Sequence, residues 1–251
     1  MGNKPVQEIG WCCVPPVTLG IVAVFLHFTN TNLVVFKIFN TLPGRMLWAN
    51  LTELGDGLIL GVILFPFLKK KKQILVAYLI GIVVNTIVVQ GLKSFFAFPR
   101  PAGVLAPESI RIIGPLLTSR AFPSGHSATI FLVAGIVSYV FKDVRIRLGV
   151  LLLAISVGFS RVAVGAHWPL DVLTGGSIGW VIGWGTAWIV QKKQWVPYSR
   201  KGDWVLGSVY GLAGAISLFF YPLQYPGGWI VHYGIAAIAW GWGMFFLFRE
   251  A

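Results

Sequence analysis

Residues 57–92 read GLILGVILFPFLKKKKQILVAYLIGIVVNTIVVQGL, in which two apolar runs flank the four consecutive lysines from Lys69 to Lys72. The second run, residues 73–92, is long enough to cross the hydrocarbon core of a bilayer, which takes about 20 apolar residues. A basic turn between two apolar runs is typical of a membrane hairpin whose turn lies in the cytoplasm. This stretch therefore predicts a protein built from antiparallel transmembrane helices.

The composition of the whole chain supports the same fold class. Among 251 residues, 56% are hydrophobic and 11% are charged, and the mean hydropathy is +0.78. A soluble domain carries about 25% charged residues, so that class is excluded. We predict an all-α, polytopic transmembrane helical bundle. Its eight expected spans lie near residues 14–29, 57–68, 73–92, 125–141, 146–164, 170–190, 204–222 and 229–248.

The distribution of basic residues predicts the orientation and argues against a nucleic-acid partner. The formal net charge is +12, but the 20 Lys and Arg residues fall in short runs between apolar segments rather than in one stripe. Most of them lie on the inner side if the N-terminus is cytoplasmic, which predicts that both termini are inside. The first apolar segment is interpreted as a retained anchor, because no small-residue cleavage site follows it.

Some local patterns concern packing. Residues 33–54 mix large apolar side chains with Lys37 and Arg45, which is typical of helices lying along the membrane surface. Gly175, Gly179 and Gly183 recur at every fourth position of the sixth span. They favour close helix packing within the monomer, with a dimer seam as the alternative.

The two cysteines, Cys12 and Cys13, are adjacent. They allow neither a disulfide framework nor a metal-ligand spacing.

Three polar clusters interrupt this apolar chain. They read KSFFAFPRP at residues 93–101, PSGH at residues 123–126 and SRVAVGAHWPLD at residues 160–171. With the N-terminus inside, each cluster falls at an outer end of a span, so all three are expected at one membrane face. Residues 93–124 would form an ordered lid or re-entrant loop there. Charged residues near membrane segments are candidates for a functional site.

The third cluster combines an imidazole with a carboxylate at a helix start. Pro169 suits the first position of a helix, so His167 lies just before the helix and Asp171 lies in its first turn. A carboxylate that accepts the Nδ1 proton of an imidazole leaves Nε2 free to act as a nucleophile. The alternative for Asp171 is an acidic residue that only complements the helix N-terminus.

The second cluster predicts another helix start. Ser124 is a plausible N-cap, and the backbone N–H groups of Gly125 and the residues after it would point toward an anion. His126 would stand at the mouth, where it could protonate a leaving alkoxide. The alternative is an ordinary capped helix with an interfacial histidine.

The remaining charges of the clusters are cations. Pro99 and Pro101 hold the chain around Arg100 extended, and Lys93 and Arg161 add two further positive charges. Together they could neutralise the oxygens of a phosphoryl group during in-line transfer. The alternative is anchoring at the membrane interface by snorkelling, which does not explain why Arg161 stands six residues from a histidine.

These strings resemble the signatures K-x6-R-P, P-S-G-H and S-R-x5-H-x3-D of the type 2 phosphatidic acid phosphatase (PAP2) superfamily, and they match all three in order across residues 93–171. The resemblance implies a six-span membrane core, with the site at the extracytoplasmic face in bacterial members. We therefore expect residues 1–203 to form the core and residues 204–251 to add two helices outside the family pattern.

The resemblance also implies a role for each matching residue. His167 would attack phosphorus and form a phosphohistidine, Asp171 would orient it, and His126 would be the general acid. No metal or other cofactor would be needed. The phosphate would be held by five further residues, namely Lys93, Arg100, Ser124, Gly125 and Arg161.

Candidates outside the clusters are less specific. Glu108 and Arg111, within the expected lid, are candidate substrate contacts. Glu53 and Asp56 precede the second span, where helix capping is favoured over contact with a head group. Residues 50–52 match a glycosylation sequon by pattern only. His27 and His232 lie in or near apolar spans and have no charged neighbours in the sequence. They are interpreted as packing or interfacial residues.

The leading hypothesis is a lipid phosphatase of the bacterial inner membrane, whose partners are the bilayer and a phosphorylated lipid. The resemblance implies four candidate substrates, namely undecaprenyl diphosphate, phosphatidylglycerol phosphate, phosphatidic acid and lipid A phosphate. A phosphotransferase that passes the phosphoryl group to another lipid uses the same motifs and stays open. A non-enzymatic anion transporter is disfavoured, because its polar groups would lie near the bilayer midplane. The oligomeric state is not specified by the sequence.

Overall fold

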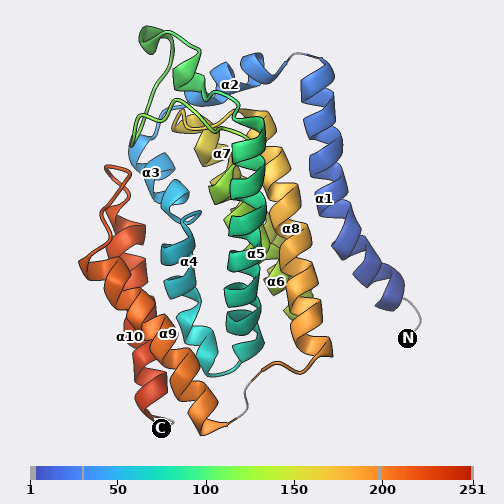
Figure 1. Ribbon diagram of the computed structural model, residues 1–251, viewed down its shortest axis with the longest axis vertical. Coiled ribbons are helices and arrows are strands. Elements are labelled where there is room, and N and C mark those ends of the chain that lie inside the picture. The colour runs from blue at the N-terminus through green and yellow to red at the C-terminus, as the bar shows by residue number, and fades with distance from the viewer. Residues whose placement is uncertain (1–3, 30, 197–198, 250–251) are drawn as a thin grey trace.

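The computed structural model describes residues 4–29, 31–196 and 199–249, and the regular structure in these ranges is helical throughout. The long helices run up and down, so both termini lie at one end of the bundle, while helix α2 and the connection after α5 lie at the other (Figure 1). The elements are α1 (Lys4–Phe28), α2 (Asn32–Asn40), α3 (Arg45–Glu53), α4 (Gly57–Leu64), η1 (Phe65–Leu68), α5 (Lys72–Phe96), η2 (Pro101–Gly103), η3 (Pro107–Ser109), α6 (Gly125–Val140), α7 (Val144–Ala163), α8 (Pro169–Lys192), α9 (Arg200–Phe219), η4 (Ile230–Ile235) and α10 (Ala236–Arg249).

A helix stands at each of the eight predicted spans. Among the described residues, five helices are long and apolar enough to cross a membrane, or six if the bent pair α3–α4 counts as one span. The all-α transmembrane class is therefore confirmed, while the number eight stays a prediction. The segment predicted to lie along the membrane surface forms α2 and α3, and α3 meets α4 at an angle of 71°.

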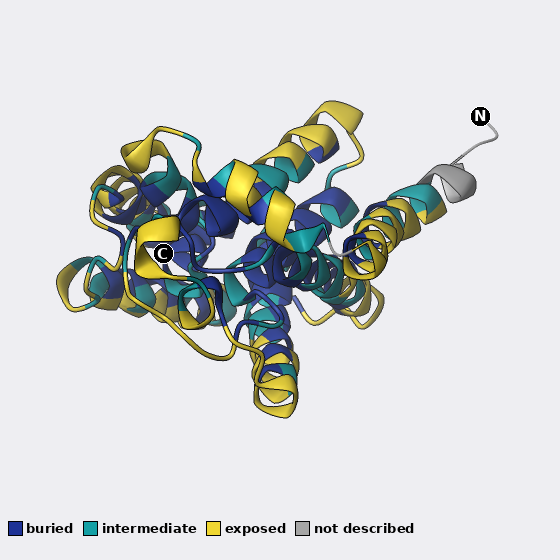
Figure 2. Ribbon diagram, turned by 90° about the horizontal axis from the view of Figure 1, so that it is seen from above, coloured by how far each residue is buried: buried dark blue, intermediate teal, exposed yellow. Residues whose placement is uncertain are grey.

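The outer faces of the helices carry large apolar side chains that no other part of the described chain covers. Ile21, Ile87, Leu152 and Leu212 each expose more than half of their surface, and exposed residues line the periphery of the bundle seen from above (Figure 2). Such a surface is favourable only against hydrocarbon. The chain is an integral membrane protein.

The centre of the bundle is a close contact between α6 and α8. A Cβ atom added at Gly175, Gly179 or Gly183 would collide with a backbone carbonyl of α6 or its N-cap, those of Ser124, Ala128 and Leu132 respectively. The glycine repeat thus serves packing within the monomer. Because the two backbones touch over several turns, the N-terminal ends of α6 and α8 are held side by side, and these ends carry two of the three polar clusters.

The last two helices form a hairpin against α4 and η1, and its connection, residues 220–229, returns to the end where α3 lies (Figure 1). Asn50 donates to the carbonyl of Gly227 at 2.7 Å and accepts from the N–H of Val231 at 3.0 Å, so the amide of the sequon is used in packing. Asp56 caps α4 as predicted, accepting from two backbone N–H groups. The division of the chain at residue 203 stays a prediction.

His232 is fully buried with its ring stacked on that of Tyr221, as expected of a packing residue, but it also has a charged neighbour. Its Nδ1 lies 3.0 Å from Oε2 of Glu53, and both side chains are buried. The two residues lie 179 positions apart, so the apolar sequence around His232 gave no sign of a charged neighbour. His27 is exposed at the end of α1 with its ring against Phe28, as expected of an interfacial residue.

Candidate active site

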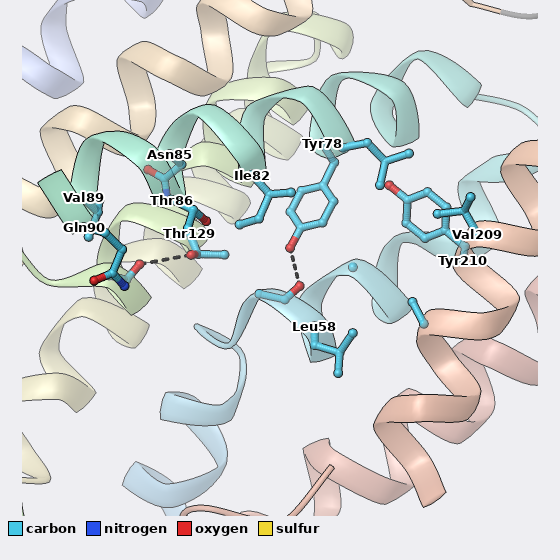
Figure 3. Close-up of a pocket in the computed structure, with 15 residues that line it drawn as sticks. Leu58, Tyr78, Ile82, Asn85, Thr86, Val89, Gln90, Thr129, Val209 and Tyr210 are labelled. Carbon is cyan, nitrogen blue, oxygen red and sulfur yellow. Dashed lines mark hydrogen bonds between the residues drawn. The ribbon is translucent and has the colours of Figure 1, made fainter. Parts of the chain in front are cut away.

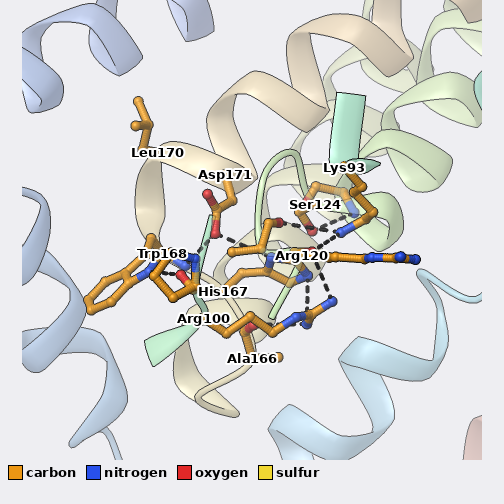
Figure 4. Close-up of polar contacts among 12 residues, drawn as sticks. Lys93, Arg100, Arg120, Ser124, Ala166, His167, Trp168, Leu170 and Asp171 are labelled. Carbon is orange, nitrogen blue, oxygen red and sulfur yellow. Dashed lines mark hydrogen bonds and ion pairs between the residues drawn. The ribbon is translucent and has the colours of Figure 1, made fainter. Parts of the chain in front are cut away.

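The three polar clusters meet at the end of the bundle that lies opposite the termini (Figures 1 and 4). Each cluster occupies the end of a helix: the first follows α5, the second begins α6, and the third joins α7 to α8. Eight residues of these clusters were predicted to bind phosphate or to catalyse. All but Gly125 and His126 are almost fully buried, with exposed fractions of 9% or less: Lys93, Arg100, Ser124, Arg161, His167 and Asp171.

The tautomer of His167 follows from its two ring contacts. Its Nε2 lies 3.2 Å from Nη1 of Arg100, and its Nδ1 lies 3.3 Å from Oδ2 of Asp171. A guanidinium can only donate hydrogen bonds, so Nε2 is the acceptor and carries the lone pair. The proton of the neutral ring then lies on Nδ1, facing the carboxylate. Asp171 also accepts from the backbone N–H of Trp168 at 2.9 Å, which fixes the carboxylate in the first turn of α8.

The surroundings keep this imidazole neutral. Burial, followed by the positive charges of Arg100 and Arg161, holds the pKa of His167 well below its usual value of 6.5. Burial disfavours the charged form of the ring, and the protonated ring would add a further cation to a site that already contains several. His167 therefore presents an unprotonated Nε2 at neutral pH.

Backbone carbonyls hold the two cations of the first cluster. Lys93 Nζ donates to the carbonyl of Arg120 at 2.7 Å, and Arg100 Nε donates to that of Ser119 at 2.8 Å. Arg100 Nη1 also donates to the carbonyl of Ala166 at 3.0 Å. The end of the lid, residues 119–121, thus orients both cations toward His167 (Figure 4).

Arg161, in the last turn of α7, is the most deeply buried cation of the site, at 1% exposure. Its Nη1 donates to the hydroxyl of Thr52 and, at 2.8 Å, to the hydroxyl of Tyr225. Its Nε has no hydrogen-bond partner among the described residues. The contacts of this guanidinium are therefore neutral hydroxyls.

Charge is unbalanced in this buried site. Lys93, Arg100 and Arg161 contribute three positive charges, whereas Asp171 contributes one negative charge, and none of the three cations forms an ion pair with a carboxylate in the part of the chain that the structure describes. Leaving a charge buried without a counter-charge costs several kcal/mol. The site is therefore electrostatically suited to an anion of about two charges.

The N-terminus of α6 adds neutral donors and a second imidazole. Ser124 is the N-cap as predicted, its Oγ accepting from the N–H of Ser127 at 3.4 Å. Its own N–H donates to the carbonyl of Asp171 at 2.9 Å, which ties the second cluster to the third. His126 is half-buried, and a Cβ on Gly55 would lie 2.7 Å from its Cβ, so the turn between α3 and α4 packs directly on it.

Neither of the two candidate contacts in the lid forms a described hydrogen bond or ion pair with a charged side chain of the site. Glu108 is exposed in η3. Arg111 donates from Nη2 to the carbonyl of Ala163 at 3.4 Å, and its backbone exchanges two hydrogen bonds with the side chain of Asn40. These contacts fasten the lid to α2 and to the end of α7, and a role in substrate contact stays a prediction for both residues.

Three residues of the site have no counterpart in the expected motifs. Thr52 and Tyr225 bind Arg161 from 109 and 64 positions away, and the carbonyl of Arg120 receives Lys93. Tyr225 stands beside no recognisable polar cluster in the sequence, and the polar residues around Thr52 match none of the three motifs. Hydrogen bonds at such separations follow no periodicity. Only Arg120, three residues before Pro123, could have been suspected from its place in the lid.

A cavity of about 410 Å³ extends from the site between α4, α5, α6 and α9. Gly125 of the second cluster lines it, together with Asn85, Thr86, Gln90 and Thr129 near that end, whereas Leu58, Tyr78, Ile82 and Val209 line its far part (Figure 3). The buried Oδ1 of Asn85 has no hydrogen-bond partner among the described residues. The cavity is therefore polar at the end near Gly125 and more apolar away from it.

No group of three or more His, Cys, Asp or Glu side chains among the described residues could hold a metal ion. The chemistry available to the residues present is that of an imidazole nucleophile, an acid or base, and a set of buried cations.

Comparison with known proteins gives consistent matches. Residues 74–195 match the family model of the PAP2 superfamily. The chain is 28% identical over 165 residues to an undecaprenyl-diphosphatase of Sulfolobus acidocaldarius, covering 63% of this chain and 74% of that protein. It is 33% identical over 139 residues to a lipid A 4'-phosphatase of Helicobacter pylori, covering 53% and 66%. The crystal structure of Aquifex aeolicus LpxE superposes with a TM-score of 0.56 at 30% identity, covering 61% of this chain and 93% of that one.

Proposed function

Since this chain belongs to the PAP2 superfamily and is a membrane phosphatase of that family, we propose that it hydrolyses a lipid phosphate through a phosphohistidine on His167. The observation that carries the proposal is the cluster of three buried cations with a single carboxylate, around an imidazole whose Nε2 bears the lone pair. A phosphate monoester supplies the missing negative charge and places an electrophilic phosphorus next to that lone pair.

The first step uses the geometry of His167. Its Nε2 attacks phosphorus while Asp171 accepts the Nδ1–H and stabilises the charge that develops on the ring. Arg100, which donates to Nε2 in the structure, turns its N–H groups to the phosphate oxygens when the N–P bond forms. The bond from phosphorus to the leaving oxygen breaks in the same step.

His126 serves the leaving group in the first step and water in the second. It donates a proton to the departing alkoxide or phosphate oxygen, and it then accepts a proton from the water that attacks the phosphohistidine. Lys93, Arg161 and the N–H groups at the start of α6 hold the equatorial oxygens through both steps. The products are inorganic phosphate and the dephosphorylated lipid.

The cavity beside Gly125 supports a lipid as the substrate. Its polar end would hold the groups next to the phosphate, and its apolar far part would receive the first portion of a hydrocarbon chain. The two relatives named above act on a polyprenyl diphosphate and on lipid A by their names, so these two classes lead the substrate panel, followed by phosphatidylglycerol phosphate and phosphatidic acid.

The orientation proposed is both termini in the cytoplasm and the active site outside. The turn with Lys69 to Lys72 lies at the same end as the termini, and clusters of basic residues are retained on the cytoplasmic side. In a bacterium this orientation places the reaction at the outer face of the inner membrane.

The experiment that tests the proposal measures phosphate release from this panel by the purified protein and by His167→Ala. We expect the variant to lose at least about a thousandfold in rate and to form no acid-labile phosphoenzyme from labelled substrate. The control is His27→Ala, which alters an exposed histidine outside the site. Hydrolysis by His167→Ala at the wild-type rate would refute the mechanism. Label recovered on a second lipid, rather than as inorganic phosphate, would identify a phosphotransferase.

A further inference from the structure

The connection between α9 and α10 places a tyrosine against two residues of the active site, although it lies outside the matched residues 74–195. Tyr225 is 3% exposed, and its hydroxyl accepts a hydrogen bond from Arg161 Nη1 at 2.8 Å. We propose that Tyr225 is a positioning residue for Arg161 and His126, which makes the C-terminal hairpin a required part of the active site.

The aromatic ring of Tyr225 contacts the same arginine and also His126. The guanidinium carbon of Arg161 lies 5.2 Å from the ring centre, within the range of a cation–π contact. The ring of His126 meets the same ring nearly edge-on, at 77° and 6.2 Å between centres. The side chain of Tyr225 therefore contacts both Arg161, which is proposed to bind phosphate, and His126, which is proposed to move the proton.

Arg161 depends on this contact because its hydrogen-bonding set is small. Its Nη1 has Thr52 and Tyr225 as partners, its Nε has none among the described residues, and it pairs with no carboxylate there. Loss of the tyrosine would leave a long, flexible side chain held by one hydroxyl. A cation that is not held in place before the substrate arrives loses conformational entropy on binding, and this weakens the affinity for phosphate.

Tyr225 is itself held rigidly by other segments. A Cβ on Gly114, whose φ is +96°, would lie 2.5 Å from the tyrosine ring, so the lid backbone rests directly on it. Ala49, Ile113 and Val164 pack around the same ring. The tyrosine thus joins α3, the lid and the end of α7 at one point.

Separate contacts anchor the hairpin, and they do not involve the Tyr225 side chain. Asn50, Glu53 and Asp56, spaced by three residues, bind Val231, His232 and the hydroxyl of Tyr221 respectively, the last at 2.8 Å. Removal of the Tyr225 hydroxyl should therefore leave the hairpin in place. This separation allows a positioning role to be distinguished from a structural one.

The test compares Tyr225→Phe with Tyr221→Phe, which removes a hydroxyl of the same connection that bonds Asp56 and not Arg161. For Tyr225→Phe we expect the inhibition constant of inorganic phosphate and the KM for lipid phosphate to rise by about three- to tenfold, with a smaller change in kcat. Tyr221→Phe should stay within twofold in both constants. Tyr225→Leu, which also removes the ring from His126, should lower kcat further.

A merely structural role would lower the melting temperature and the active fraction without changing either constant per active site. Constants for Tyr225→Phe within twofold of the wild type, or an equal rise in Tyr221→Phe, would overturn the proposal even if Tyr225→Leu does not fold.

The inference rests on the proposed function in taking Arg161 as a phosphate ligand and His126 as the proton donor. Binding of inorganic phosphate, which involves the first role alone, is therefore also measured by calorimetry on the His167→Ala background. Absence of phosphate binding there would count against the proposed function. Equal binding with and without Tyr225→Phe would count against the tyrosine alone.

Discussion

At the scale of single residues, two neighbours set the state of His167. Arg100 donates to Nε2 and Asp171 faces Nδ1, so one contact keeps the lone pair on Nε2, the nitrogen proposed to attack phosphorus, and the other keeps the proton on Nδ1. Each contact carries a prediction of its own.

Asp171→Asn should lower kcat by about a thousandfold with little change in KM, because the amide cannot stabilise the positive ring and can present an N–H to Nδ1, which favours the wrong tautomer. Steady-state kinetics with one lipid phosphate measure this effect. Asp143→Asn, the same change at the exposed N-cap of α7, should leave kcat within twofold. A fall of less than tenfold for Asp171→Asn would argue against the orienting role.

Arg100→Gln should shift the pH dependence of kcat/KM. The attack requires a neutral ring, and the pKa of His167 is held well below 6.5 by burial and by Arg100 and Arg161. Activity is therefore retained as the pH falls, until the pH approaches this lowered pKa. Removal of one positive charge raises the pKa, so we expect the acid limb to move upward by about one unit. A profile measured with the same substrate for both proteins, and found unshifted, would contradict this assignment.

At the scale of elements, the contact between α6 and α8 sets the distance between the second and third clusters. Because backbone lies against backbone at Gly179 and Gly183, a methyl group can be accommodated only if the helices separate. Such a separation would move Ser124 and His126 away from His167 and Asp171.

Gly179→Ala should therefore lower both stability and activity, the former by about 1–3 kcal/mol, as measured by thermal unfolding in detergent and by phosphate release. Gly185→Ala, in the same helix, is the matched control, since a Cβ there meets nothing within 4 Å. That change should be neutral or slightly stabilising, because alanine is the better helix former. Equal effects of the two substitutions would show that helix packing does not limit the site.

At the scale of the whole molecule, helices α4, α5, α6 and α9 enclose the cavity beside Gly125, and α9 belongs to the C-terminal hairpin. Besides the contacts that anchor it, the hairpin thus contributes Tyr225 to the site and α9 to the wall of the cavity.

Ala213→Trp places a large side chain on the wall that α9 contributes to this cavity. We expect the KM for a long-chain lipid phosphate to rise about tenfold, in keeping with loss of apolar burial of the chain. The KM for a short water-soluble phosphomonoester should not change. Leu212→Trp, on an exposed face of the same helix, provides the control. An equal rise in KM for both substrates would show that the hydrocarbon chain of the lipid does not bind in this cavity.

Much of this molecule could be predicted from local patterns. Runs of apolar residues determined the helices, because a bilayer admits only segments whose backbone hydrogen bonds are internal. Alternation of those spans determined that Lys93, His126 and His167 would reach one face. The neighbouring pair His167 and Asp171 is likewise local, since Asp171 lies in the first turn of the helix that begins two residues after His167.

The tertiary structure decided the rest. The contacts concerned join residues far apart in the sequence. Tyr225 and Thr52 bind Arg161, Glu53 pairs with His232, and residues of four helices line the cavity. Such contacts depend on the rotation and tilt of each helix, which the packing of side chains sets and hydrophobic periodicity does not encode. The sequence by itself thus determined which residues lie at the membrane face that holds the site, whereas the packing of the helices decided which of them touch.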